Sequence, residues 1–118
     1  MLLLDDLIGL PFKVNGRGEN GLDCFGLIWL IALRNGTPIN DPDYKGFDPE
    51  LVKLADEIGV KKIESFEKGC IIEIIKDGRL HLGYALDENH MIHCTINEGV
   101  IVEEINKYEA KGYYTYAH

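Results

Sequence analysis

The hydrophobic pattern changes character about halfway along the chain. In the first half, a short apolar run over residues 2–8 predicts a short helix, and residues 25–33 are nearly all apolar. A helix that is apolar on every side is expected to be buried all round. Residues 48–58 predict a further helix, which starts at Asp48-Pro49-Glu50 with proline in its first position and ends before Gly59.

The second half alternates short apolar runs with turn signals such as Asp77-Gly78 and Asn97-Glu98-Gly99. The runs predict about five strands, over residues 71–76, 80–86, 90–96, 100–105 and 113–116. Helices followed by a meander of strands favour an α+β fold in which the helices pack on an antiparallel sheet.

Length and charge limit the number of domains and the classes of partner that the chain can have. A chain of 118 residues is long enough for one domain, which we place at residues 1–118. The net charge of -8 and the absence of any basic cluster larger than Lys61-Lys62 argue against nucleic acid as a partner. The N-terminus lacks the basic region of a secretory signal peptide, and no apolar run reaches the length of a membrane span. Three cysteines do not make a disulfide framework, so a reducing compartment is expected.

Cys24 follows a glycine-rich loop and stands where the apolar helix begins, directly after Asp23. Asp23 is a good N-cap residue. Backbone N–H groups point outward at a helix N-terminus, and the helix dipole favours negative charge there. This position therefore favours a thiolate and makes Cys24 a candidate nucleophile.

A nucleophilic cysteine needs a base within hydrogen-bond reach. If Asp87-Glu88-Asn89 is a three-residue hairpin loop, Gly83 faces His93, and His81 becomes its diagonal neighbour at roughly 5–7 Å between Cβ atoms. A two-residue loop would put the two histidines on opposite faces. In the register with the three-residue loop, His81 accepts the thiol proton and His93 orients the His81 ring.

The small residues Gly83 and Ala85 would leave room beside His81 for the helix that carries Cys24. The same parity turns His90 and Cys94 to the other face of the sheet. We interpret Cys70 and Cys94 as core residues.

A metal site is the first alternative. Cys24, His81, His93 and Cys94 are four possible zinc ligands, but they lack the close spacing of most zinc sites, so no metal or other cofactor is expected.

Three blocks in order, GLDCFGL, HLGYAL and MIHC, resemble the NlpC-type cell-wall cysteine peptidases, which have a papain-like fold. The resemblance runs from about Asp5 to Tyr116. It implies a Cys24–His81–His93 triad that hydrolyses amide bonds in peptidoglycan stem peptides, commonly the bond between D-γ-glutamate and the diamino acid.

The glycine-rich approach to Cys24 and the aromatic Phe25 look most like the short phage-tail members of this family. That likeness implies synthesis in the bacterial cytoplasm, a place in the virion tail, and other tail proteins as possible partners. Many secreted members have tyrosine where Phe12 stands, near the active site, and serine where Phe25 stands. By this resemblance Phe12 and Asp23 lie beside the oxyanion and substrate positions. The missing hydroxyl at Phe12 favours the second alternative, a structural tail-tip module with the same fold and little activity.

Overall fold

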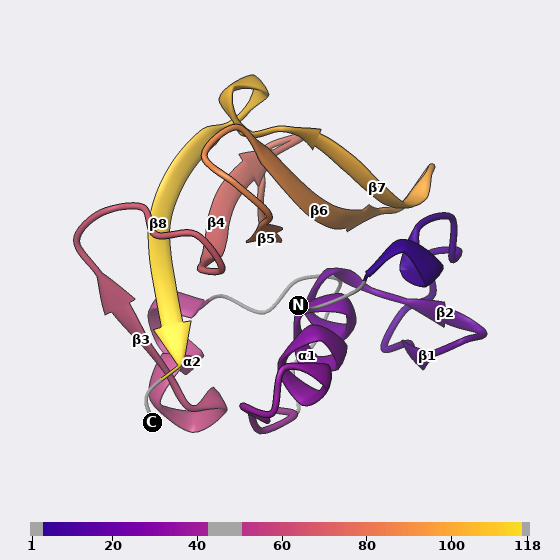
Figure 1. Ribbon diagram of the computed structural model, residues 1–118, viewed down its shortest axis with the longest axis horizontal. Helices are drawn as coiled ribbons and strands as arrows, with labels where there is room; N and C mark the ends of the chain where they lie inside the picture. Colours follow the sequence, from indigo (N-terminus) through magenta and orange to yellow (C-terminus); the bar gives the residue numbers. More distant parts are fainter. Residues whose placement is uncertain (1–3, 43–50, 117–118) are drawn as a thin grey trace.

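The computed structural model describes residues 4–42 and 51–116 of the 118-residue chain (Figure 1). The helical elements are the 3-10 helices η1 (Asp5–Leu7) and η2 (Ile105–Lys107) and the α-helices α1 (Cys24–Arg34) and α2 (Leu51–Ile58). The strands are β1 (Arg17–Gly18), β2 (Gly21–Leu22), β3 (Val60–Ile63), β4 (Ile71–Lys76), β5 (Arg79–Ala85), β6 (His90–Thr95), β7 (Gly99–Glu104) and β8 (Glu109–Tyr116). In the described part of the chain, no helix is both long and apolar enough to cross a lipid bilayer.

The main sheet is antiparallel and has six strands in the order β3-β8-β4-β5-β6-β7. The expected α+β class is confirmed, and strands β4 to β7 form the predicted meander. The count of about five strands was too low, and the last strand does not continue the meander. Instead, β8 returns across the sheet and pairs with both β4 and β3.

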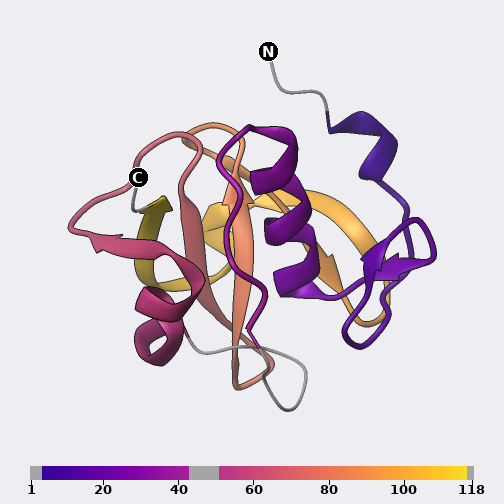
Figure 2. The same ribbon diagram turned by 90° about the horizontal axis from the view of Figure 1, so that it is seen from below.

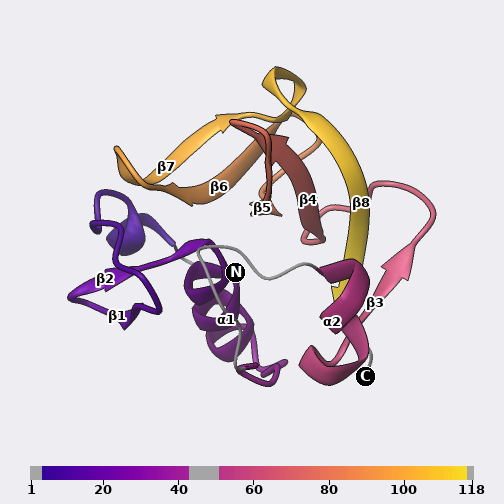
Figure 3. The same cartoon turned by 180° about the vertical axis from the view of Figure 1, so that it is seen from behind.

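Both α-helices lie on the concave side of the curved sheet (Figures 1 and 3). The main core lies between α1 and the sheet, where Leu27, Ile28 and Ile31 pack with residues such as Leu82 and Ile92. Helix α1 was expected to be buried all round, but this is wrong at its C-terminal end, where Leu33 is 51% exposed.

A smaller apolar cluster covers the convex face of the sheet. Ile72, Ile74, Ala85 and Met91 form it together with Cys70, and aromatic residues including Tyr108 pack against it. Because strand residues alternate between faces, β4, β5 and β6 each contribute to both clusters.

Two elements differ from the expected pattern near the chain's middle and start. Strand β3 was missed because only two of its four residues, Val60 and Ile63, are apolar, and it is an edge strand. The N-terminal helix is reduced to the single 3-10 turn η1 in the described residues. The end of the second helix at Ile58 is confirmed, whereas its proposed start at Asp48-Pro49-Glu50 lies outside the described residues.

The N-terminal segment lies along the free edge of β7. The Gly9 N–H donates to the Val100 carbonyl at 2.9 Å, and the Val100 N–H donates to the Leu10 carbonyl at 2.9 Å. Seen from below, this segment and the β1–β2 ribbon lie to one side of α1 (Figure 2). This placement brings the residues just before α1 next to the β6–β7 end of the sheet.

Candidate active site

Helix α1 begins at Cys24, and Asp23 is its N-cap as predicted. The Gly26 N–H donates to Asp23 Oδ1 at 2.6 Å, which satisfies one of the backbone donors that a helix N-terminus leaves open. Both Asp23 and Cys24 are fully buried. The first turn of the helix is therefore held in place by a carboxylate directly beside the cysteine.

The glycine-rich loop wraps around the same carboxylate. The Asn15 N–H donates to Asp23 Oδ2 at 3.1 Å, and Arg17 Nη1 donates to Asp23 Oδ1 at 3.0 Å. Arg17 also binds Asp41 through two nitrogens, at 2.9 and 3.0 Å. A side chain at Gly26 would collide with the Gly16 carbonyl oxygen, so the close approach of the loop to the helix requires glycine there. The loop therefore fixes where the helix begins.

The hairpin between β5 and β6 has the register that places the two histidines together. Leu86 N–H donates to the His90 carbonyl at 2.9 Å, and Gly83 pairs with His93. His81 Nε2 lies 2.9 Å from His93 Nδ1, and the ring centroids are 5.0 Å apart. The predicted contact of the two imidazoles is confirmed.

His81 stands at the mouth of a cleft. The pairing of β5 with β6 ends at Gly83 and His93, so His81 lies beyond the last paired residue. A cleft of about 220 Å³ is lined here by His81, Cys94 and Phe12, together with charged residues of the β4–β5 turn. Phe12 therefore lines the same cleft as His81.

The start of α1 lies beside the same end of β6. Cys94 Sγ donates to the Leu22 carbonyl at 3.1 Å, and Cys24 is two residues further along the chain. Helix α1 packs against both β5 and β6. The structure thus brings the first turn of α1 to the end of the strands that carry His81 and His93.

Helix α1 packs on a different face of the sheet from the one expected. The room beside Gly83 and Ala85 is filled by Met91, whose Sδ would lie 2.7 Å from a Cβ on Gly83. Helix α1 packs instead on the opposite face, against Leu82 and Ile92. Helix α1 therefore does not lie on the face that carries His81 and His93.

The histidine pair continues into an ionic network on the convex face. His93 Nε2 lies 2.7 Å from Glu103 Oε1, and the Tyr108 hydroxyl donates to the same oxygen at 2.7 Å. Burial and the neighbouring His81 lower the pKa of His93 to about 4, although Glu103 opposes this shift. His93 is therefore neutral at neutral pH.

Glu103 is the residue that our sequence reasoning missed. On β7, Ile101 pairs with His93 and Glu103 pairs with Met91, so Glu103 is the diagonal neighbour of His93 on one face. The same parity argument that paired His81 with His93 finds it once the β6–β7 turn is known.

The other cysteines are placed as core residues, as expected. Burial raises the pKa of Cys94 to about 12, and Asp23 adds to this shift. Burial also raises the pKa of Cys70. Neither group offers a thiolate near neutral pH.

His90 is directed away from the site and bonds with Asp87, at 3.1 Å from Nδ1 to Oδ1. His118 lies outside the described residues. Among residues 4–42 and 51–116, no group of three or more His, Cys, Asp or Glu side chains is arranged to hold a metal ion.

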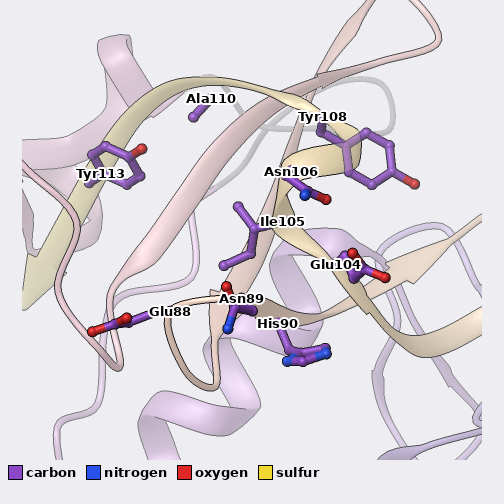
Figure 4. A pocket seen from close by; sticks show the side chains of 9 residues that line it. All are labelled: Glu88, Asn89, His90, Glu104, Ile105, Asn106, Tyr108, Ala110 and Tyr113. Carbon is purple, nitrogen blue, oxygen red and sulfur yellow. The ribbon is translucent and has the colours of Figure 1, made fainter.

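A larger cavity of about 550 Å³ lies elsewhere, where η2 and β8 adjoin the β5–β6 turn (Figure 4). Its lining includes His90, Glu104, Tyr108 and Tyr113, and none of the three predicted triad residues.

Comparison with known proteins supports the sequence-based resemblance. No protein-family model matches the chain. The probable peptidoglycan endopeptidase LytE of Bacillus subtilis is 26% identical over 100 residues, which cover 85% of this chain and 27% of LytE. The chain thus spans about a quarter of that relative.

Solved structures show the same fold. The NlpC/p60 domain of the peptidoglycan hydrolase SagA matches with a TM-score of 0.68 and 19% identity, covering 93% of this chain and 90% of that one. NlpC2 of Trichomonas vaginalis matches with a TM-score of 0.67 and 20% identity, covering 95% of this chain and 45% of that one. An NlpC/p60 protein of Bacillus cereus matches with a TM-score of 0.66 and 23% identity, covering 95% of this chain and 37% of that one. The predicted fold is confirmed.

Proposed function

We propose that this chain, which resembles the NlpC-type cell-wall peptidases in sequence and in fold, is a cysteine peptidase that hydrolyses peptidoglycan stem peptides. The observation that carries the proposal is the contact of His81 with His93 at 2.9 Å, at a cleft beside the start of the helix that Cys24 opens. A cysteine at a helix N-terminus, an imidazole base and a second group that orients this base are the residues that thiol-based acyl transfer uses.

In this mechanism, His81 takes the proton of the Cys24 thiol, and the thiolate attacks the carbonyl carbon of the stem peptide. Backbone N–H groups at the start of α1 stabilise the oxyanion that forms. The C–N bond breaks as His81 returns the proton to the leaving amine. Water, deprotonated by His81, then hydrolyses the acyl-enzyme, while His93 keeps the His81 ring oriented.

The finer part of the proposal is the bond cleaved, between D-γ-glutamate and the diamino acid. Stem peptides carry free carboxylates next to this bond, and the cleft is lined by Arg79 and by Lys76, whose ammonium is paired with Asp77 at 2.9 Å. The resemblance to NlpC-type peptidases supports the same bond. Mass analysis of the products released from defined muropeptides would identify it.

The proposal extends to delivery by a phage tail. It is supported by the resemblance of the glycine-rich approach to Cys24 and of the aromatic Phe25 to the short phage-tail members. In the structure, the Phe25 ring centroid lies 5.3 Å from Arg17 Cζ. Mass spectrometry of purified virions tests this part, and a chain found only outside particles would contradict it.

Digestion of purified sacculi tests the activity itself. Cys24→Ala should abolish product release, whereas Cys70→Ala, which alters a buried cysteine on the convex face, should not. His81→Ala should lower turnover about 10²-fold or more through loss of general-base catalysis, and His90→Ala should leave it unchanged. Hydrolysis that survives Cys24→Ala would exclude the cysteine mechanism. A correctly folded wild type without turnover would instead favour the structural tail-tip module.

A further inference from the structure

Glu103 lies at the end of a line of polar side chains that crosses three neighbouring strands on one face. His81 on β5 contacts His93 on β6 at 2.9 Å, and His93 contacts Glu103 on β7 at 2.7 Å. His93, in the middle, is fully buried, while the Glu103 side chain is 19% exposed. Lys107 at the end of η2 and Tyr108, the next residue, bind the Glu103 carboxylate at 3.6 and 2.7 Å.

The charge on Glu103 fixes the direction of every hydrogen bond in this line. Partial burial would raise the pKa of Glu103, but hydrogen bonds from Tyr108 and His93 outweigh it, and the pKa lies below its usual value. An ionised carboxylate only accepts hydrogen bonds, so His93 Nε2 must carry the proton between them. Since His93 is neutral, its Nδ1 is then an acceptor.

The same logic passes to the next ring. Because His93 Nδ1 accepts, His81 Nε2 must donate across the 2.9 Å contact. Neutral His81 consequently keeps its lone pair on Nδ1. Without an acceptor-only group beyond His93, both neutral tautomers of the pair would satisfy the His81–His93 hydrogen bond equally well.

We propose that Glu103 is a positioning residue of the peptidase, which selects the His81 tautomer whose Nδ1 accepts the thiol proton of Cys24. The inference rests on the proposed function for its catalytic consequence, although the tautomer claim stands on the contacts alone. In the step concerned, the S–H bond of Cys24 breaks and an N–H bond forms at His81 Nδ1. His93 and Glu103 keep their own protons and charges throughout.

Histidine tautomers are read directly by long-range ¹H–¹⁵N NMR correlation on ring-labelled protein. The Cys24→Ala variant is the right background because it removes the thiol that exchanges a proton with His81. We expect His81 and His93 both to be protonated at Nε2. A spectrum with His93 protonated at Nδ1 overturns the proposal, whether or not the protein has peptidase activity.

Two variants of Glu103 then test the cause. Glu103→Leu removes the acceptor and should give a mixture of tautomers, whereas Glu103→Gln keeps the shape and presents both a donor and an acceptor. Glu104→Leu is the matched control, because Glu104 is the next residue on β7, exposed and on the opposite face. Unchanged tautomers in both Glu103 variants would overturn the proposal.

Turnover supplies the second readout, with the thiol restored. Loss of the tautomer-setting carboxylate in a serine protease triad lowers kcat about 10⁴-fold, and Glu103 acts one ring further away, so we expect a fall of about 10-fold or more in Glu103→Leu. The KM should stay near the wild-type value, since Glu103 is not among the residues that line the cleft. A wild type that is active and a Glu103→Leu variant that keeps its kcat would reject the positioning role and leave the proposed function intact.

Discussion

The carboxylate of Asp23 connects the glycine-rich loop to the helix that carries Cys24, and its removal is the sharpest test of how the site is held. Asp23 accepts hydrogen bonds from Gly26 N–H at 2.6 Å, Asn15 N–H at 3.1 Å and Arg17 Nη1 at 3.0 Å. The carboxylate is fully buried. Asp23→Ala therefore leaves the Gly26 and Asn15 N–H groups without their acceptor, whereas Arg17 Nη1 keeps its hydrogen bond to the Gly16 carbonyl at 2.8 Å.

The expected size of the effect follows from these contacts. Loss of an N-cap costs about 1 kcal/mol, and each buried donor left unsatisfied costs about 1–3 kcal/mol. Because the donors share one carboxylate and the N-cap bond is one of them, the costs do not add fully, and we expect Asp23→Ala to lower the free energy of unfolding by about 3–5 kcal/mol. Asp23→Asn keeps one oxygen acceptor for the cap and should cost about 1–2 kcal/mol.

Urea unfolding followed by circular dichroism measures both variants. Asp41→Ala is the control, because it removes the exposed partner of the same Arg17 and should cost less than about 1 kcal/mol. An Asp23→Ala protein within about 1 kcal/mol of wild type would show that the carboxylate does not hold the loop and helix together. If Asp23→Asn loses turnover at unchanged stability, the carboxylate has a chemical role beyond capping.

Three further predictions concern the chemistry. The free energy of unfolding should fall by about 3 kcal/mol from pH 7 to pH 4, because His93 takes up a proton near pH 6.5 in the unfolded chain and only at about pH 4 in the folded protein. His93→Gln should make the free energy of unfolding less dependent on pH over this range. Iodoacetamide should label Cys24 before Cys70 and Cys94, as read by mass spectrometry, since all three are buried and only a thiolate reacts quickly; faster labelling of Cys94 would contradict this. Phe12→Tyr should raise muropeptide turnover if the absent hydroxyl limits the rate, and an unchanged rate would show that it does not.

Those parts of the fold that depend on local patterns could be predicted from the sequence. The apolar run after Cys24 predicted α1. Of the two registers considered for the turn at Asp87, the three-residue loop is the one that joins His81 to His93. Strand order could not be predicted in the same way. The pairing of β8 with β3 and β4 joins residues far apart in the chain, and no local pattern encodes which strands become neighbours.

In the candidate site, too, contacts within one hairpin could be predicted and contacts that depend on packing or on a second strand pairing could not. The contact of the two histidines follows from strand parity within one hairpin, and this hydrogen bond is present. Parity alone did not show that Met91 fills the space beside Gly83, because that depends on how side chains pack on the convex face. Glu103 required a second register, between β6 and β7, and a carboxylate on an exposed strand is usually solvated.

The position of β8 between β3 and β4 has a consequence for how the protein is made. On a ribosome, strands β4 to β7 emerge before β8, so β4 waits as an unpaired edge until residues 109–116 are synthesised. Unpaired edges promote association between chains, and pairing over long sequence distances slows folding. A nascent chain that stalls before β8 would thus carry the β5–β6 hairpin and helix α1 on a sheet whose β4 edge can pair with other chains. Pairing of β8 with β4 and β3 removes this unpaired edge.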